Sequence, residues 1–131
     1  HADGTVETPQ ESSSTRVIDE SVADQVKNAM ESVAEGYSKV VNVKGYRIAA
    51  KTGTAEVAGS DGRLTLIVAD FAGMIPADNP RFAITVIMKD PQGTYGGMTA
   101  GPVFAKIGEF LMQKYNVPTS SPRNDAIAVD W

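Results

Sequence analysis

The chain has 131 residues, of which 42% are hydrophobic and 21% are charged, as in ordinary globular domains, so neither whole-chain disorder nor a fibrous structure is indicated. Its formal net charge of -4 at pH 7, with scattered lysines and arginines, argues against binding to nucleic acid, which needs clustered cations. The absence of cysteine excludes a disulfide framework and a thiolate nucleophile, and no apolar run approaches the roughly 20 residues that span a bilayer.

The N-terminal part of the chain is predicted to contain an arm and one helix. Residues 1–16 are rich in Thr, Ser and Glu and include one Gly, which is typical of an exposed arm or loop. The chain begins with histidine and lacks a signal-peptide pattern, so we expect a processed or excised piece of a longer polypeptide. Asp19 or Ser21 is suited to cap a helix that should run to about Ala34, where Gly36 stops it. The apolar positions that recur at helical spacing are Val22, Val26, Met30 and Val33.

Three strands are predicted next. Alternation over residues 46–51 predicts a strand that carries Lys51 on the face opposite Tyr46. The Gly-Ser-Asp-Gly turn at 59–62, followed by the branched and aromatic residues 64–74, predicts a β-hairpin. After a second turn, the apolar positions of a third alternating strand are Phe82, Ile84, Val86 and Met88.

A second helix is predicted near the C-terminus. Gly93, Gly96 and Gly97 are expected to form a loop, and Pro102 should lie near the first turn of a helix that ends around Tyr115. The apolar stripe of this helix is predicted to be Val103, Phe104, Ile107, Phe110 and Leu111.

The order of helix, three strands and helix predicts an α+β fold, with an antiparallel sheet and helices packed on it. Residues 116–131 contain two prolines and little periodicity, so we expect an extended or mobile tail after this body.

The most informative segment is Lys51-Thr52-Gly53-Thr54, which combines an ammonium group, two hydroxyl groups and a residue without a side chain. These groups suit an anionic ligand, and a peptide could add itself to such an edge through main-chain hydrogen bonds. Glycine inside a strand indicates a bulge or a close approach by a ligand. The alternative is a solvated lysine at a strand end, followed by a turn. A phosphate-binding loop starting at Gly45 is rejected, because glycines follow where its helix should run.

The nucleophile of such a site is expected to lie elsewhere. No serine in the chain has a lysine three positions later or an asparagine two positions later. No constellation of residues suggests a metal site, and no cofactor is predicted.

Three segments carry a family resemblance: Lys-Thr-Gly-Thr-Ala-Glu at 51–56, Pro-Ala-Asp-Asn-Pro-Arg at 76–81, and Gly-Gly-Met-Thr-Ala-Gly-Pro-Val-Phe at 96–104. In this order they resemble the C-terminal part of class B penicillin-binding protein transpeptidase domains, which are monofunctional peptidoglycan D,D-transpeptidases, here of the division type. The resemblance places residues 17–115 in that domain. It implies a fold similar to the serine β-lactamases, with further strands supplied by the preceding portion of the protein. Ala50 departs from the pattern, because many relatives have glycine there.

The resemblance also implies roles for the four motif residues. Lys51 would create a positive field around the substrate carboxylate, and the hydroxyl groups of Thr52 and Thr54 would bind it. The Thr54 N–H would join the oxyanion hole, which makes Lys51 and Thr54 the catalytic residues of this segment. Gly53 would let the strand lie close to the ligand. A serine would form an acyl-enzyme with a peptidoglycan stem peptide, or with a β-lactam antibiotic in its place.

The first partner implied is the preceding portion of the same protein, which would carry the Ser-x-x-Lys and Ser-x-Asn motifs. Cell-division proteins are a further class of partner. The enzyme would act at the extracytoplasmic face of the bacterial cell membrane, anchored through sequence absent from this chain. A non-catalytic penicillin-binding sensor, a serine β-lactamase and a D,D-carboxypeptidase are the alternatives. An unpaired sheet edge or an uncovered apolar face should make the isolated chain fold poorly.

Overall fold

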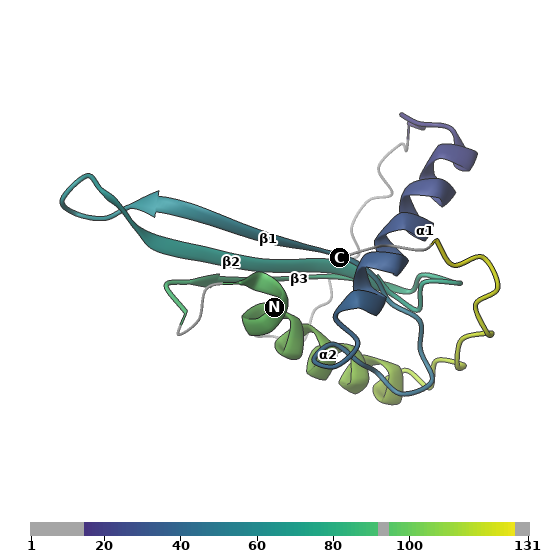
Figure 1. Cartoon of the computed structure of the whole chain (residues 1–131). Coiled ribbons are helices and arrows are strands. Elements are labelled where there is room, and N and C mark those ends of the chain that lie inside the picture. The colour runs from purple at the N-terminus through teal and green to yellow at the C-terminus, as the bar shows by residue number, and fades with distance from the viewer. Residues whose placement is uncertain (1–14, 92–94, 128–131) are drawn as a thin grey trace, which may run out of the picture.

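The computed structural model describes residues 15–91 and 95–127. Residues 1–14 of the predicted arm, Gly93 of the predicted loop and residues 128–131 of the tail lie outside the described residues. Within them the chain forms α1 (Glu20–Gly36), β1 (Ala49–Ala58), β2 (Leu64–Ile75), β3 (Phe82–Lys89) and α2 (Gly96–Lys114). The strands form an antiparallel sheet in the order β1-β2-β3. Figure 1 shows α1 at one end of the sheet, α2 along it, and the β1–β2 hairpin projecting away from both helices. The predicted α+β fold is confirmed.

The sheet has two faces that differ in burial. On one face, which we call the α2 face, Ala50, Ala69, Phe71 and Val86 are buried. Residues that pair directly across two strands point to the same face of the sheet. The strand registers therefore also define the opposite face, which we call the Lys51 face. On the Lys51 face the following side chains are all half-buried or exposed: Lys51, Ala55, Val57, Leu66, Val68, Asp70, Ala72 and Ile87. The chain therefore builds a core on one side of its sheet and leaves most of the other side open, with Ala49 as a fully buried exception.

The core lies between the sheet and α2. The rings of Phe71 and Phe104 are fully buried, with centroids 5.0 Å apart. Ile75 and Met112 are the other large side chains with almost no exposure. Burying a side chain of this size stabilises a fold by about 1.5–3 kcal/mol, so each of these four makes a sizeable contribution to the core.

Helix α2 begins earlier than predicted. Gly96 and Gly97 form its first turn rather than a loop, and Pro102 lies inside the helix. A Cβ atom on Gly97 would collide with the ring of Tyr37, and one on Gly101 would lie 2.5 Å from Val41 Cγ2. Tight packing of this turn on its neighbours thus explains why residues that favour loops are helical here.

The predicted apolar stripe of α2 is partly wrong for the same reason. Phe104 is buried as expected, whereas Ile107 and Phe110 are 37% and 58% exposed. Most positions that face the core carry small residues, because the helix lies so close to the sheet. The buried positions are Gly96, Gly97, Ala100, Gly101, Phe104, Ala105, Gly108 and Met112.

Helix α1 has the predicted bounds within two residues, but its apolar stripe is not its buried face. Val22 and Val26 are 44% and 52% exposed, while Glu31, Ser32 and Ala34 are buried. The polar face is buried because it meets two arginines from other segments, described below. The valines remain uncovered by the part of the chain that is described.

The first strand begins later than predicted and extends further. Tyr46 forms an isolated bridge with Val43, and β1 starts at Ala49. Lys51 is therefore the third residue of a ten-residue strand. The alternative of a lysine at a strand end followed by a turn is excluded, because residues 52–54 continue the strand. Gly53 causes no bulge, since the register shift between β1 and β2 occurs at Val57/Ala58.

The C-terminal segment after α2 is anchored, although residues 117–127 form neither helix nor strand. The Tyr46 hydroxyl donates to Val117 O at 2.6 Å, and Ser120 N donates to Gly45 O at 2.9 Å. The Ser120 hydroxyl and the Ser121 N–H donate to the carboxylate of Asp78, at 2.7 and 2.9 Å. The segment is thus tied to the turn before β1 and to the turn between β2 and β3, which lie at the same end of the sheet.

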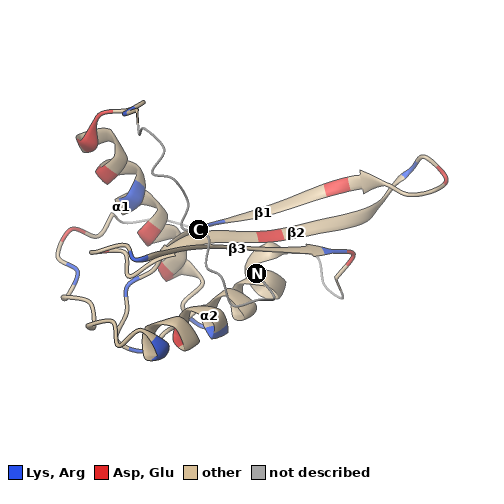
Figure 2. Cartoon of the chain, turned by 180° about the vertical axis from the view of Figure 1, so that it is seen from behind, with Lys and Arg blue, Asp and Glu red and all other residues tan. Residues whose placement is uncertain are grey.

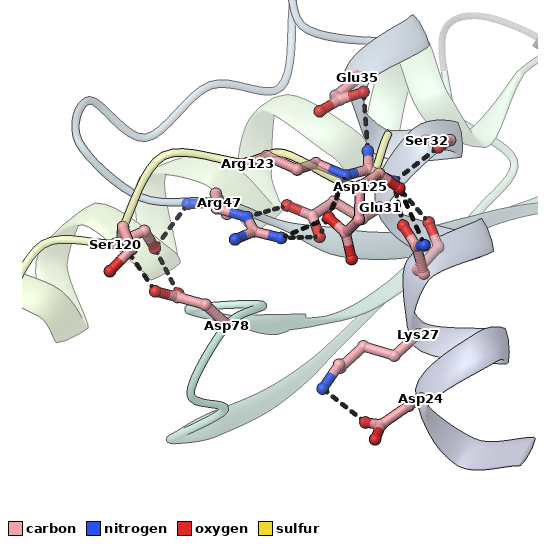
Figure 3. A network of polar contacts seen from close by, with 12 residues as sticks. Asp24, Lys27, Glu31, Ser32, Glu35, Arg47, Asp78, Ser120, Arg123 and Asp125 are labelled. Carbon is pink, nitrogen blue, oxygen red and sulfur yellow. Dashed lines mark hydrogen bonds and ion pairs between the residues drawn. The ribbon is translucent and has the colours of Figure 1, made fainter. Parts of the chain in front are cut away.

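Two arginines converge on one buried carboxylate of α1 (Figure 3). Arg47 donates to Glu31 through Nε at 2.5 Å and Nη2 at 2.8 Å. Arg123, from the tail, places Nε 3.7 Å from Glu31 Oε2 and Nη1 2.8 Å from Glu35 Oε2. Its side chain is only 6% exposed, and Nη2 donates to three further atoms of α1: Asn28 O, Asn28 Oδ1 and Ser32 Oγ. This network joins α1, the segment before β1 and the tail.

The charges of this region shift two pKa values. Partial burial disfavours the charged form of Asp78, but the hydrogen bonds from Ser120 and Ser121, with the nearby charge of Arg47, outweigh it and lower the pKa of Asp78 below 3.8. The hydrogen bond to Glu31 raises the pKa of Arg47.

Replacing Arg123 with methionine should destabilise the full-length protein by about 2–4 kcal/mol, because it leaves the buried Glu31 with one cation and removes the tail from α1. Urea unfolding would measure this. Lys27→Met is the matched control on the same helix, since its exposed pair with Asp24 should be worth less than about 1 kcal/mol. Equal effects of the two substitutions would contradict a structural role for the tail.

Replacing Asp78 with asparagine should reduce the acid sensitivity of the protein. Because the pKa of Asp78 in the folded state is below its ordinary 3.8, its contribution is complete above that value and disappears as the pH falls through the lower folded-state pKa. Below about pH 4, the free energy of unfolding should therefore fall less steeply with decreasing pH for Asp78→Asn than for the parent protein. Asp61→Asn, in the exposed hairpin turn, should follow the parent.

Candidate active-site edge

β1 is an edge strand, paired with β2 on one side and with no described strand on the other. Asp90 N donates to Ile67 O at 2.6 Å, so odd-numbered residues of β2 direct their backbone polar groups toward β3, and even-numbered ones toward β1. The even-numbered residues of β2 pair with odd-numbered residues of β1. Thr52 and Thr54 therefore direct their backbone N–H and C=O groups to the free edge.

The ammonium group of Lys51 bends toward this edge. Its side chain is exposed, and Nζ donates to Thr52 O at 2.7 Å and lies 3.3 Å from Thr52 Oγ1. A cation, a hydroxyl group and outward-facing amides are thus brought together along residues 51–54. An anionic group placed at the edge would meet all of them.

The side chain of Thr54 is held by the start of α2. Gly96 N donates to Thr54 Oγ1 at 3.3 Å, on the α2 face of the sheet. Since the hydroxyl oxygen accepts this bond, its own proton stays available to donate to a ligand. Gly96 thus orients a hydroxyl group of the predicted site, a role that its expected place in a loop did not suggest.

Gly53 has a packing reason within the chain. A Cβ atom there would collide with the carboxylate of Asp70, whose Cγ would lie 2.6 Å away. A Cβ atom on Gly96 would in turn collide with the carbonyl oxygens of Gly53 and Asp70. The carboxylate of Asp70 therefore covers the Gly53–Asp70 pair on the Lys51 face, and the first turn of α2 covers it on the α2 face.

The departure from the family pattern at Ala50 is accommodated by its partner. Ala50 pairs with Gly73 across the strands and is completely buried. A Cβ atom on Gly73 would lie 2.7 Å from that of Ala50. The extra methyl group takes the space that the glycine opposite leaves.

Two residues border the site for which the sequence predicts no role there. Gly96 is expected in a loop and belongs to a segment that carries the resemblance, and Asp70 belongs to the predicted strand 64–74. Asp70 is the one acidic residue of the predicted strand 64–74, and a charge inside such an apolar segment was the available signal.

Other kinds of site find little support in residues 15–91 and 95–127. No group of three His, Cys, Asp or Glu side chains is arranged to hold a metal ion there. None of the helices in these residues is long and apolar enough to cross a bilayer. A cavity of about 200 Å³ between α1 and the segment before β1 is lined by residues such as Glu31 and Arg47, not by residues 51–54.

Comparison with known proteins identifies similar chains. Residues 2–109 match the family model of the penicillin binding protein transpeptidase domain. The peptidoglycan D,D-transpeptidase FtsI of Escherichia coli is 44% identical over 107 residues, which are 78% of this chain and 18% of FtsI. The penicillin-binding protein PbpB of Mycolicibacterium smegmatis is 34% identical, over 90% of this chain and 20% of its own length.

Solved structures agree with these matches. A peptidoglycan synthetase from Bifidobacterium adolescentis is 66% identical, with a TM-score of 0.84, over 98% of this chain and 24% of that chain. Penicillin-binding protein 3 of Mycobacterium tuberculosis, solved in complex with ampicillin, is 31% identical, with a TM-score of 0.74, over 94% of this chain and 30% of that chain. The chain spans less than a third of the length of each of these relatives.

Replacing Gly96 with alanine should destabilise the full-length protein by about 1–3 kcal/mol, because the added methyl group meets backbone atoms of two strands that cannot move aside. Thermal unfolding would measure the loss. Gly108→Ala is the control on the same helix: its methyl group would meet only side-chain ends, at 3.3 Å or more. That variant should be near neutral, since alanine favours helix over glycine by roughly 1 kcal/mol.

Proposed function

The chain belongs to the penicillin binding protein transpeptidase domain family, and on that basis we propose that it is the C-terminal part of a peptidoglycan D,D-transpeptidase. The observation that supports this best is the β1 edge, where Lys51, Thr52 and Thr54 present a cation, hydroxyl groups and backbone N–H groups that no described strand pairs. The names of the curated relatives favour peptide transfer over a sensor or a hydrolase.

The preceding portion of the protein supplies the rest of the site in this proposal. It carries the Ser-x-x-Lys and Ser-x-Asn motifs, which this chain lacks. The open Lys51 face and the exposed valines of α1 are surfaces for that portion to cover, since large apolar areas are seldom left exposed.

The reaction divides between the two portions. A serine oxygen of the preceding portion adds to the carbonyl carbon of the penultimate D-alanine of a stem peptide, and the terminal D-alanine leaves with a proton on its nitrogen. The amine of a second stem peptide then attacks the acyl-serine, forms the new amide and returns a proton to the serine oxygen. Lys51, Thr52 and Thr54 bind the terminal carboxylate, and the Thr54 N–H stabilises the oxyanion. Gly53 lets the strand lie close to the ligand.

β-Lactam antibiotics enter the same site and acylate the same serine. The ampicillin complex of the Mycobacterium tuberculosis relative is consistent with such a ligand. The enzyme would work at the extracytoplasmic face of the bacterial membrane, anchored through its preceding portion, and would assemble with cell-division proteins.

Lys51→Ala and Thr54→Val should each lower the rate of acylation of the full-length protein by a fluorescent penicillin, by about 10²–10³-fold. The physical reason is the loss of a charge or a donor that stabilises the bound carboxylate. Lys106→Ala, an exposed lysine of α2, is the control and should react at the parent rate. The acylation rates would be measured by stopped-flow fluorescence or by gel-based labelling at a series of times. Unchanged rates in both site variants would remove these residues from the site.

A further inference from the structure

Asp70 is a charge in an apolar setting at the centre of the sheet. Charged residues are few along the three strands (Figure 2). Asp70 lies on the middle strand and on the Lys51 face, where Gly53 and Ile87 are its direct partners on either side. Its neighbours along the strand on the same face are Val68 and Ala72. Four residues without polar side-chain groups therefore surround its carboxylate.

The described part of the chain gives this carboxylate no partner. No hydrogen bond or ion pair joins Asp70 to any residue in it. The two lysines at diagonal positions, Lys51 and Lys89, form no ion pair with it within 4 Å, and Lys51 donates to Thr52 instead. The carboxylate lies against Gly53, where it occupies the space that a Cβ atom would need.

A ligand at the β1 edge would lie beside the sheet, whereas the carboxylate of Asp70 stands over Gly53 on the Lys51 face. Neighbouring strands lie about 4.7–4.9 Å apart, so the backbone of a peptide added to the free edge would be one strand spacing from Gly53 and two from β2. The group that meets Asp70 must instead come from whatever covers the Lys51 face. A carboxylate covered by protein and left unpaired is strongly unfavourable, and a cationic side chain satisfies it with charge-assisted hydrogen bonds.

We propose that Asp70 is a positioning residue: its carboxylate pairs with a lysine or arginine of the preceding portion and fixes that portion over Gly53, beside the edge formed by residues 51–54. This rests on the proposed function, in which the preceding portion covers the Lys51 face. Gly53 makes the pairing possible, because it leaves room for the carboxylate next to the strand that binds the substrate.

The test uses the full-length protein with Asp70→Asn, which keeps the shape of the side chain and removes its charge. Acylation by a fluorescent penicillin should slow at least tenfold, and the melting temperature without ligand should fall. Glu56→Gln is the matched control: it removes one negative charge from the same hairpin, on the opposite face, at an exposed residue. This control should match the parent in both measurements.

The partner is identified by replacing each lysine and arginine of the preceding portion with methionine. One of these variants should reproduce the loss seen with Asp70→Asn, and combining the two should cost little more than either alone. Exchanging the charges, with Asp70→Lys and aspartate at the partner position, should restore folding and acylation even if the single variants do not fold.

Acylation of Asp70→Asn within twofold of the parent rate would overturn the inference. The inference would also be overturned if the loss of acylation rate caused by Asp70→Asn added fully to that of every lysine and arginine substitution in the preceding portion. If the parent protein is not acylated by penicillin at all, the proposed function fails instead, and the melting temperatures still decide whether Asp70 is paired.

Discussion

The architecture depends on one close contact, in which the first turn of α2 lies directly on the backbone of the β1–β2 pair. Gly96 meets the carbonyl groups of Gly53 and Asp70 with no side chain between them. The contact fixes the height of α2 above the sheet, and this height explains why glycine and alanine fill most of the helix positions that face the core. It also places an N–H group against the hydroxyl of Thr54, so core packing and the candidate site share one constraint.

Local pattern was sufficient for the elements whose side chains alternate between core and solvent. The β2–β3 pairing and the end of α2 follow from such alternation and from turn residues, because those signals are local. The start of α2 could not be read in this way. Adjacent glycines favour a loop in isolation, and only the strands beneath them make a helical turn without side chains the favoured structure.

The face of α1 that is buried was also beyond local pattern. Its valines recur at helical spacing and indicate a core stripe, yet the buried face holds Glu31 and Ser32. The partners of that face, Arg47 and Arg123, are separated from it by 16 and 92 positions in the sequence, and no periodicity reports such pairs. For the site, the sequence placed Lys51 on an exposed position of a strand but did not indicate that Gly96 and Asp70 border it.

Burial and charge together argue that this chain is organised around a surface it does not itself complete. The α2 face has a dense core, whereas the Lys51 face combines exposed apolar residues such as Val57 and Ile87 with Asp70, which pairs with no residue of the described part of the chain. In a strand with one face in solvent, the residues on that face are usually polar and alternate with the apolar residues of the core face. A face meant for another protein segment needs apolar area for affinity and a few charges for register, and the Lys51 face has both. The candidate edge at residues 51–54 lies at the border of that surface, so a second segment placed on the Lys51 face would come next to the edge without disturbing the core on the opposite face.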